Sequence, residues 1–446
     1  MVEHLPLHHF KMSPLHHFTT SPLHHMLTII SIIFILGYLA IALEHPLKVN
    51  KGASALLLAV VCWSIYALSS PDNHTVGEQL QHHLGSIAEI IFFLLGAMTI
   101  VELIATHNGF SIVTQSITTT SKRKLLWIIC FITFFLSAIL DNLTTSIVMV
   151  TLVQKMLHHR NDRLLFSSMI VIAANAGGAW SPIGDVTTTM LWIGNQISTL
   201  NIIKELFLPS LLCLIVPLLY QSRLISGTFE RPNQDKPDEL EAGGQSILIL
   251  GVLSLLFVPI FKTITHLPPY LGMLGSVGVL WTVTELMHHG KEDRTHLRIY
   301  HALTRIDVPS TLFFLGILLA VSCLESIGQL NTLATWLDTT VGNKEIIVTL
   351  LGALSAVVDN VPLTAAVQGM YSLDMYPTDH KIWEMLAYAV GTGGSMLIIG
   401  SAAGVVVMGM ENISFGWYMR KIAFTAMLGY LAGIATYLAI FALLGH

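Results

Sequence analysis

The residues best placed to do chemistry are two acid-amide pairs, each in the middle of an apolar stretch. Asp141 and Asn142 interrupt FLSAILDNLTTSIVMV, and Asp359 and Asn360 interrupt GALSAVVDNVPLTAAVQGM. An ionised carboxylate at bilayer depth costs at least about 2.5–3.5 kcal/mol on insertion scales, so an acid in such a place indicates a functional role. Because the pair occurs twice, we interpret the two copies as parts of one site.

A glycine-rich interruption follows each pair. The first reads ANAGGAWSPIGDVTTTM, with Gly178 and Gly184, and the second reads AVGTGGSMLIIGSAAGV, with Gly394 and Gly400 at the same spacing. Glycine inside a helix costs about 1 kcal/mol relative to alanine, so the recurrence predicts two broken helices. Such interruptions at corresponding places of two halves are typical of a transport site at the membrane midplane. Close helix packing is the alternative interpretation for any single glycine.

These segments predict a site for a monovalent cation, with Na+ at Asp141 and Asp359. Unwound backbone exposes carbonyl oxygens, and the C-terminal end of a half-helix favours positive charge. Asp185 is a third acid, and Ser401 stands at the corresponding place in the second half. Glu102 and Glu325, each downstream of an FFL segment, are candidates for a proton relay. The full predicted ion-binding and proton-coupling set is Asp141, Asn142, Thr144, Thr145, Asn175, Gly177, Gly178, Asp185, Asp359, Asn360, Thr364, Gly391, Thr392, Gly393 and Gly394.

A free aspartic acid has a pKa of about 3.9, too low for proton exchange near neutrality. Desolvation and a second like charge each favour the protonated form of a carboxyl group. We therefore expect Na+ and H+ to compete for the Asp141 and Asp359 carboxyls, which should titrate as a coupled pair.

The composition indicates a polytopic, all-α membrane protein. The chain has 446 residues, of which 53% are hydrophobic and only 11% charged, whereas soluble domains carry about 25% charged residues. The four cysteines lie in apolar runs without paired spacing, which is typical of reduced, structural cysteines. No HExxH, P-loop or Gly-x-Ser-x-Gly motif is present, so we predict a protein that is not an enzyme, has no cofactor and binds no nucleic acid.

Apolar runs of about 17–25 residues can span a bilayer. Two further regions, 124–157 and 344–373, carry the acid-amide pairs at their midpoints and are predicted to be re-entrant hairpins, whose polar tips must be buried in protein or face an aqueous cavity. The ten predicted spans are 26–43, 52–68, 84–105, 164–194, 202–222, 245–261, 268–287, 308–324, 383–410 and 418–444.

The basic residues support this topology. Most of the 22 Lys and Arg residues fall in one alternate set of loops, 44–51, 106–123, 155–163, 223–244, 288–307 and 411–421. The positive-inside rule places that set in the cytoplasm and both termini outside. The opposite side carries only Lys11, Lys204, Lys262, Lys344 and Lys381.

An odd number of predicted crossings separates the two hairpins, so they enter the membrane from opposite sides. We therefore predict an inverted repeat with two re-entrant hairpins and two broken transmembrane helices. The hydrophilic stretch RPNQDKPDELEAGGQ reads as a linker. The predicted organisation is a His-rich tail at 1–25, scaffold helices at 26–68, transport repeat 1 at 84–222, a linker at 223–244, scaffold helices at 245–287 and transport repeat 2 at 306–444.

The tail repeats PLHH at 6–9, 14–17 and 22–25. A histidine-rich repeat can bind metal, but a disordered, solvated tail is the interpretation that we favour. The segment lacks the basic start and small-residue cleavage site of a signal peptide.

At these residues the chain resembles the NhaD family of sodium/proton antiporters, within the ion transporter superfamily that also holds dicarboxylate, citrate and arsenite carriers. The matching segments are FFLLGAMTIVELI, LDNLTT, NAGGAWSPIGDVTTTMLW, VDNVPLTAA and GTGGSMLIIGSAAGV, and they cover roughly 84–222 and 306–444. The resemblance implies exchange of Na+ or Li+ for H+, a homodimer surrounded by membrane lipid, and a bacterial inner (cytoplasmic) membrane.

Two alternatives stay open. The first is an anion carrier of the same superfamily, for arsenite or a di- or tricarboxylate. Carboxylate carriers of this superfamily have Ser-Asn-Thr at the hairpin tips, whereas Asp-Asn stands here. Two carboxylates facing one cavity repel a dianion and attract Na+, which favours the cation. The second alternative, from a different class, is an intramembrane enzyme or a metal sensor that uses the histidine tail.

Overall fold

The computed structural model describes residues 22–112, 117–229 and 240–444. In this part of the chain the structure is helical throughout, and the only bridge between extended segments joins Ser121 and Thr228. Eight helices are long and apolar enough to cross a membrane, so the protein is a multi-pass integral membrane protein, as predicted. They are α1 (Pro22–Ala42), α3 (Lys51–Ser69), α4 (Asn73–Thr106), α10 (Thr199–Leu224), α11 (Gly244–Thr265), α12 (Pro269–His288), α14 (Val308–Ser326) and the run from α20 (Phe415–Tyr418) through η2 (Met419–Ala423) to α21 (Phe424–Leu444).

The first acid-amide pair lies between two short helices, α6 (Lys122–Ser137) and α7 (Asn142–Met156). At 16 and 15 residues and 1.5 Å per residue, each is about 24 Å long or less, shorter than the ~30 Å hydrocarbon core. Helix α6 packs against α7, and Lys122 at the start of α6 lies 2.7 Å from Asp162, in the first turn of the following helix, α8 (Arg160–Gly178). The two helices therefore form a hairpin with Asp141 at its tip.

The second pair lies in a matching hairpin, α16 (Lys344–Leu354) and α17 (Asn360–Met370). Lys344 lies at the start of α16, and Tyr371 follows the end of α17. The Lys344 ammonium lies 4.4 Å from the centroid of the Tyr371 ring. Both helices have 11 residues, so this hairpin too is too short to cross the hydrocarbon core. Asp359 occupies its tip.

Each hairpin is followed by a broken helix, as the glycine pattern predicts. In the first half, α8 (Arg160–Gly178) ends and α9 (Val186–Ile193) begins after a non-helical segment, and in the second half α18 (Lys381–Gly393) is followed by α19 (Ala402–Glu411). Helix α8 ends at Gly178, the second glycine of its pair, and α18 ends at Gly393, the first glycine of its pair. The breaks are therefore at 179–185 and 394–401.

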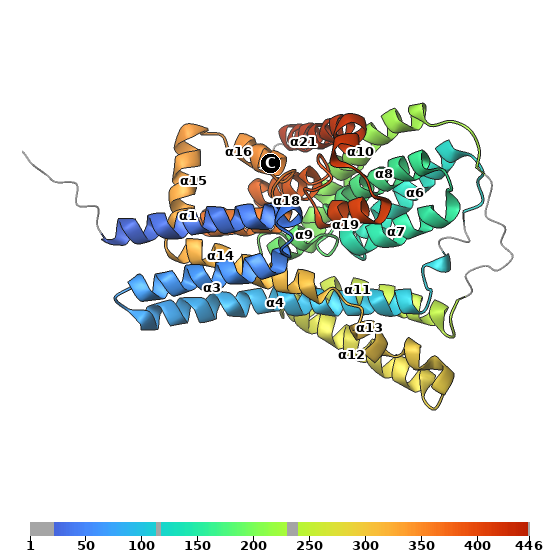
Figure 1. Ribbon diagram of the computed structural model, residues 1–446, viewed down its shortest axis with the longest axis horizontal. Helices are drawn as coiled ribbons and strands as arrows, with labels where there is room; N and C mark the ends of the chain where they lie inside the picture. Colours follow the sequence, from blue (N-terminus) through green and yellow to red (C-terminus); the bar gives the residue numbers. More distant parts are fainter. Residues whose placement is uncertain (1–21, 113–116, 230–239, 445–446) are drawn as a thin grey trace, which may run out of the picture.

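The helices form two groups (Figure 1). In this view α3, α4, α11 and α12 lie on the lower side, whereas α6, α7, α8, α10 and α21 lie on the upper side, and α18 and α19 lie beside α8 in this upper group. Helix α10 packs along α21, and α3 packs along α14. This arrangement brings the two hairpin tips and the two helix breaks to the middle of the molecule.

Two elements differ from the predicted spans. Helix α4 begins at Asn73 and not near 84, because Asp72 caps it through the backbone N–H groups of His74 and Thr75. The polar sequence before 84 therefore extends the helix beyond the apolar run. Helix α15 (Gln329–Thr340) was not predicted, since it is short and largely polar. It runs across the direction of its neighbours (Figure 1), as amphipathic helices at a membrane interface do.

The remaining helices connect these elements. They are α2 (Glu44–Leu47), η1 (Glu292–Leu297) and α13 (Ile299–Leu303). The third PLHH copy, placed in the predicted tail, forms the start of α1. The rest of that tail, and 230–239 of the predicted linker, lie outside the described residues.

Candidate functional site

Asp185 is the centre of the candidate site. It precedes α9 as its N-cap, and its Oδ1 accepts hydrogen bonds from the backbone N–H of Thr187 at 2.9 Å and from the Thr187 hydroxyl at 3.0 Å. Its side chain is buried, with 1% of the residue exposed. Because the helix N-terminus carries partial positive charge, this position favours a carboxylate.

The two hairpin tips meet at this carboxylate. Asn142 donates to Asp185 Oδ2 at 2.6 Å. Asn360 donates from the other tip, at 3.3 Å to Oδ1 and 3.4 Å to Oδ2. The amides of both acid-amide pairs thus donate to Asp185. In the sequence this acid has no acidic counterpart in the second half, where Ser401 stands instead.

Asn175 joins the two helix breaks. Its side-chain oxygen accepts from Asn142 at 3.0 Å, and its amide nitrogen donates to Ser395 at 2.9 Å and to Ser401 at 3.0 Å. Ser401 also caps α19 by accepting from the backbone N–H of Gly404 at 3.1 Å. Asn175 was a predicted site residue, whereas Ser395 was missed, because one serine in an apolar stretch carries no distinctive pattern.

The tip carboxylates cap the second arms of their hairpins. Asp141 Oδ1 accepts from the backbone N–H of Thr144 at 2.7 Å, and Asp359 Oδ1 accepts from that of Val361 at 3.2 Å. Asp141 has φ 152°, a conformation that residues with a side chain rarely adopt. Asp359 differs by having a cation beside it, because Lys51 Nζ lies 3.7 Å from its Oδ2. No sequence pattern indicates this pairing.

A small cavity lies between the tips. It has a volume of about 40 Å³, and its polar lining includes Asp141, Asn142, Asp185, Asp359 and Asn360. One water needs about 10–15 Å³ by the same measure, so the cavity has room for a small cation with part of its hydration shell. Among the described residues no three His, Cys, Asp or Glu side chains are close enough to hold one metal ion. A bound cation would therefore draw further ligands from amides, main-chain carbonyls and water.

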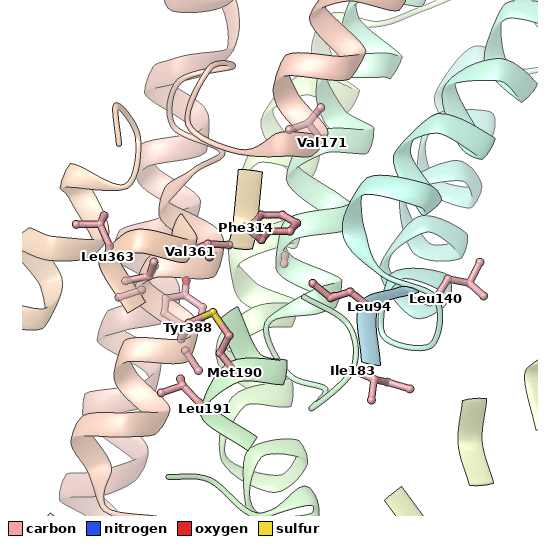
Figure 2. Packing of buried hydrophobic residues seen from close by; sticks show 14 of the residues in the cluster. Leu94, Leu140, Val171, Ile183, Met190, Leu191, Phe314, Val361, Leu363 and Tyr388 are labelled. Carbon is pink, nitrogen blue, oxygen red and sulfur yellow. The ribbon is translucent and has the colours of Figure 1, made fainter. Parts of the chain in front are cut away.

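Apart from Thr189, the rest of the cavity wall is apolar. Phe93 and Leu94 of α4 and Phe314 of α14 line it. Figure 2 shows Leu94 and Phe314 in the region between Val361, next to the second tip, and Leu140, next to the first. An apolar wall lowers the local dielectric and so strengthens the interaction between a cation and the carboxylates.

The predicted glycines allow close packing of backbones. A Cβ at Gly177 would clash with the Phe134 carbonyl of α6, and a Cβ at Gly393 would clash with the Gly352 carbonyl of α16. Gly178 and Gly394 lie against the backbone of Gly184 and Gly400, respectively. Gly391 is the one that approaches the centre, since its Cβ would lie 3.9 Å from Asp185 Oδ2.

The predicted threonines lie beside the cavity without lining it. The hydroxyls of Thr364 and Thr392 donate to main-chain carbonyls one turn earlier, of Asn360 at 3.0 Å and of Tyr388 at 2.6 Å. Thr144 contributes its backbone N–H to Asp141. The hydroxyl of Thr145 is buried and has no hydrogen-bond partner in the described part of the chain.

The two relay candidates are not part of the cavity lining. Glu102 is 24% exposed at its side chain and lies 3.8 Å from Arg305, so it is paired near the end of α4 and not deep in an apolar environment as its sequence context predicts. Glu325, near the end of α14, packs against Gly369 of α17. The structure does not bring either glutamate to the hairpin tips.

The chain was compared with known proteins. Residues 38–391 match the family model described as citrate transporter, CitMHS. A protein named sodium/proton antiporter 1 from Arabidopsis thaliana is 49% identical over 92% of this chain and 72% of its own length. A protein named Na(+)/H(+) antiporter NhaD from Vibrio cholerae is 31% identical over 91% of this chain and 90% of its own.

One solved structure, of the YdaH transporter from Alcanivorax borkumensis, is similar to this fold. It matches 94% of this chain and 99% of that chain, with a TM-score of 0.52 and 11% sequence identity. At that identity the likeness concerns the fold.

Proposed function

Because this chain belongs to the citrate transporter family and, within it, to the sodium/proton antiporters of the NhaD type, we propose that it is a secondary active transporter that exchanges Na+ (or Li+) for H+. It is a transporter and not an enzyme. The observation that carries the ion assignment is the meeting of Asn142 and Asn360 at Asp185, beside a cavity that Asp141 and Asp359 also line.

The charge of the cavity favours a cation over an anion. Three carboxylates line it, those of Asp141, Asp185 and Asp359, and Lys51 lies beside only one of them. A citrate or another carboxylate would meet like charge on two sides of the cavity. An anion carrier is therefore the less supported function, although the family model is described by citrate.

We propose that Na+ and H+ compete for these carboxylates. Binding of Na+ favours their ionised form and so releases a proton, and protonation in turn removes the charge that holds Na+. Because the three carboxyls line one small cavity, we assign the exchanged proton to the cluster and not to one residue.

We further propose that the two hairpin-bearing units are inverted repeats that move against the remaining helices. One pair of hydrogen bonds supports an internal repeat. Ser137 donates to the Ala174 carbonyl at 2.6 Å in the first unit, and Ser355 donates to the Val390 carbonyl at 2.8 Å in the second. Alternating access by movement of such units around a midplane site is the general behaviour of transporters with this organisation.

Proton flux in proteoliposomes with an imposed pH gradient tests the function. Na+, Li+, K+ and citrate are added in turn, and the internal pH is followed with a fluorescent dye. We expect Na+ or Li+ to dissipate the gradient in the wild type and not in the Asp185→Asn protein. Citrate uptake without a response to any cation would overturn the proposal.

We also propose a location and an oligomeric state for the protein. We place the protein in a bacterial inner (cytoplasmic) membrane, on the grounds that it resembles the NhaD antiporter of Vibrio cholerae, and membrane fractionation checks this.

We also propose a homodimer, because α1 and α11 keep large exposed apolar side chains such as Ile35, Leu36 and Ile260. Cross-linking in native membranes would distinguish a dimer contact from a face covered by lipid.

A further inference from the structure

Lys51, the first residue of α3, lies at the tip of the second hairpin. Its Nζ is 3.7 Å from Asp359 Oδ2 and 4.5 Å from the centroid of the Phe313 ring. The Lys51 and Asp359 side chains are 23% and 16% exposed. A long cationic side chain that is mostly buried against an aromatic ring and a carboxylate is held in place, in contrast to a solvated surface lysine.

The start of α3 is fixed by several contacts, so the position of Lys51 is built into the fold. The Asn50 side chain caps the helix by accepting from the backbone N–H of Gly52 at 2.8 Å. A Cβ at Gly52 would lie 3.2 Å from the Pro309 carbonyl, which shows how closely α3 approaches α14. The backbone N–H of Lys51 donates to Glu44 at 3.2 Å. These contacts hold the lysine toward Asp359.

The two tips are therefore chemically different. Asp359 has Lys51 beside it, whereas Asp141 takes part in no ion pair in the part of the chain that the structure describes. Both carboxylates line the same cavity as Asp185. A cation that entered this cavity would be repelled by the Lys51 ammonium near Asp359 and attracted without opposition by Asp141 and Asp185.

We propose that Lys51 is the intramolecular counter-ion of Asp359 and that it directs the transported Na+ to Asp185 and Asp141. Lys51 is a positioning and specificity-determining residue, because it acts on the ion through the charge of Asp359. This inference rests on the proposed cation/proton exchange and adds a functional difference between two tips that the sequence pattern makes alike.

The experiment measures the KM for Na+ and the maximal rate of Na+-driven proton flux in proteoliposomes of the full chain. Lys51→Met removes the charge but keeps an apolar side chain on Phe313, and Lys51→Gln removes the charge alone. We expect both to lower the KM for Na+ at least about threefold, because an uncompensated carboxylate then faces the cavity. Lys51→Arg, which keeps the charge, should keep the KM within about twofold of the wild type.

Asp359→Asn is expected to raise the KM at least about tenfold, because the Lys51 charge is then left unpaired beside the ion. The double variant Lys51→Gln/Asp359→Asn removes both charges and should return the KM to within about threefold of the wild-type value. A contact that is only structural would not be restored by removal of both partners. Lys48→Gln is the matched control, since Lys48 lies three residues away and is exposed.

An unchanged KM in both neutral Lys51 variants would overturn the inference, and so would a double variant no better than Asp359→Asn. If a neutral single variant does not fold, as judged by its elution in detergent, the comparison of the double variant with Asp359→Asn decides the question. Failure of the proposed exchange itself is seen separately, as a wild type without Na+-driven proton flux.

Discussion

Asn142 donates a 2.6 Å hydrogen bond to Asp185, and this contact ties the tip of the first hairpin to the first broken helix. Asn360 approaches the same carboxylate from the second hairpin at 3.3 Å. One carboxylate thus accepts hydrogen bonds from the tip amides of both hairpins. Under the proposed exchange, a proton or a cation at Asp185 would change the hydrogen bonds of both hairpins at once.

Replacing Asp185 by Asn should strongly slow exchange. The substitution removes the charge and one acceptor for two buried amides, and charged hydrogen bonds contribute about 1.5–3 kcal/mol each. We expect the maximal rate of Na+-driven proton flux to fall by about 100-fold or more. Asp374→Asn, at an exposed loop position, is the matched control. An Asp185→Asn protein with wild-type flux would remove Asp185 from the site.

The two tip amides should not be equivalent. Asn142 makes a short bond to Asp185 and a second bond to Asn175, whereas the bonds from Asn360 to Asp185 are 3.3 and 3.4 Å long. Asn142→Ala should therefore raise the KM for Na+ more than Asn360→Ala, by a further factor of about ten if one charged hydrogen bond of roughly 1.5 kcal/mol separates them. Sodium titrations of proton flux for both variants measure this, and equal values would contradict it.

Alanine at Gly177 or Gly393 should destabilise the protein. Each added methyl group would meet a carbonyl oxygen of the first hairpin arm, in α6 or α16, and overpacking of this kind costs about 1–3 kcal/mol. Gly77→Ala is the control, because a Cβ there has open space around it in α4 and alanine favours a helix by about 1 kcal/mol. We expect lower melting temperatures for the first two variants and an equal or higher one for Gly77→Ala. Three equal melting temperatures would show that the glycines are not packing positions.

The protein should lose stability in acid through the contact between α4 and α12. His107 Nε2 lies 3.1 Å from His288 Nε2 in a buried pair, and burial lowers the pKa of the His107 imidazole below its usual value. The unfolded chain therefore takes up a proton near pH 6.5 that the folded chain resists, and stability falls as the pH drops below about 6.5.

Thermal melts in detergent at pH 7.5 and pH 5.5 measure this effect. The wild type should melt at a lower temperature at pH 5.5, and His107→Gln should reduce the difference. A difference of the same size in both proteins would assign the acid sensitivity to other groups.

The sequence predicts the hairpin tips well, because an acid inside an apolar run is a strong local signal. Asp141 and Asp359 lie at the tips where the pattern places them. The central position of Asp185 could not be predicted, since it depends on the meeting of two tips that are far apart in the sequence. The same holds for Lys51, which the charge pattern assigns to a cytoplasmic loop, and for Arg305, which pairs with Glu102.

The glycine pattern predicts two helix breaks, but the helices run up to the glycines and unwind only from Ala179 and Gly394 onward. Glycine favours unwinding, so the pairs near Gly178 and Gly394 predict the helix breaks, and the breaks begin at or directly after them. The structure adds that Gly177 and Gly393 let a hairpin arm approach the backbone of the following helix. A sequence pattern cannot distinguish helix unwinding from close backbone packing, because both require a residue without a side chain.

The serine bonds from Ser137 to the Ala174 carbonyl and from Ser355 to the Val390 carbonyl fasten each hairpin to its own broken helix. Together with the backbone contacts at the glycines, they make each pair one stiff block. Opening a hairpin alone would break a buried bond and expose close-packed backbone. We therefore expect each hairpin and its broken helix to move together as one rigid unit during transport, so that a cross-link between the two would leave the transport rate unchanged.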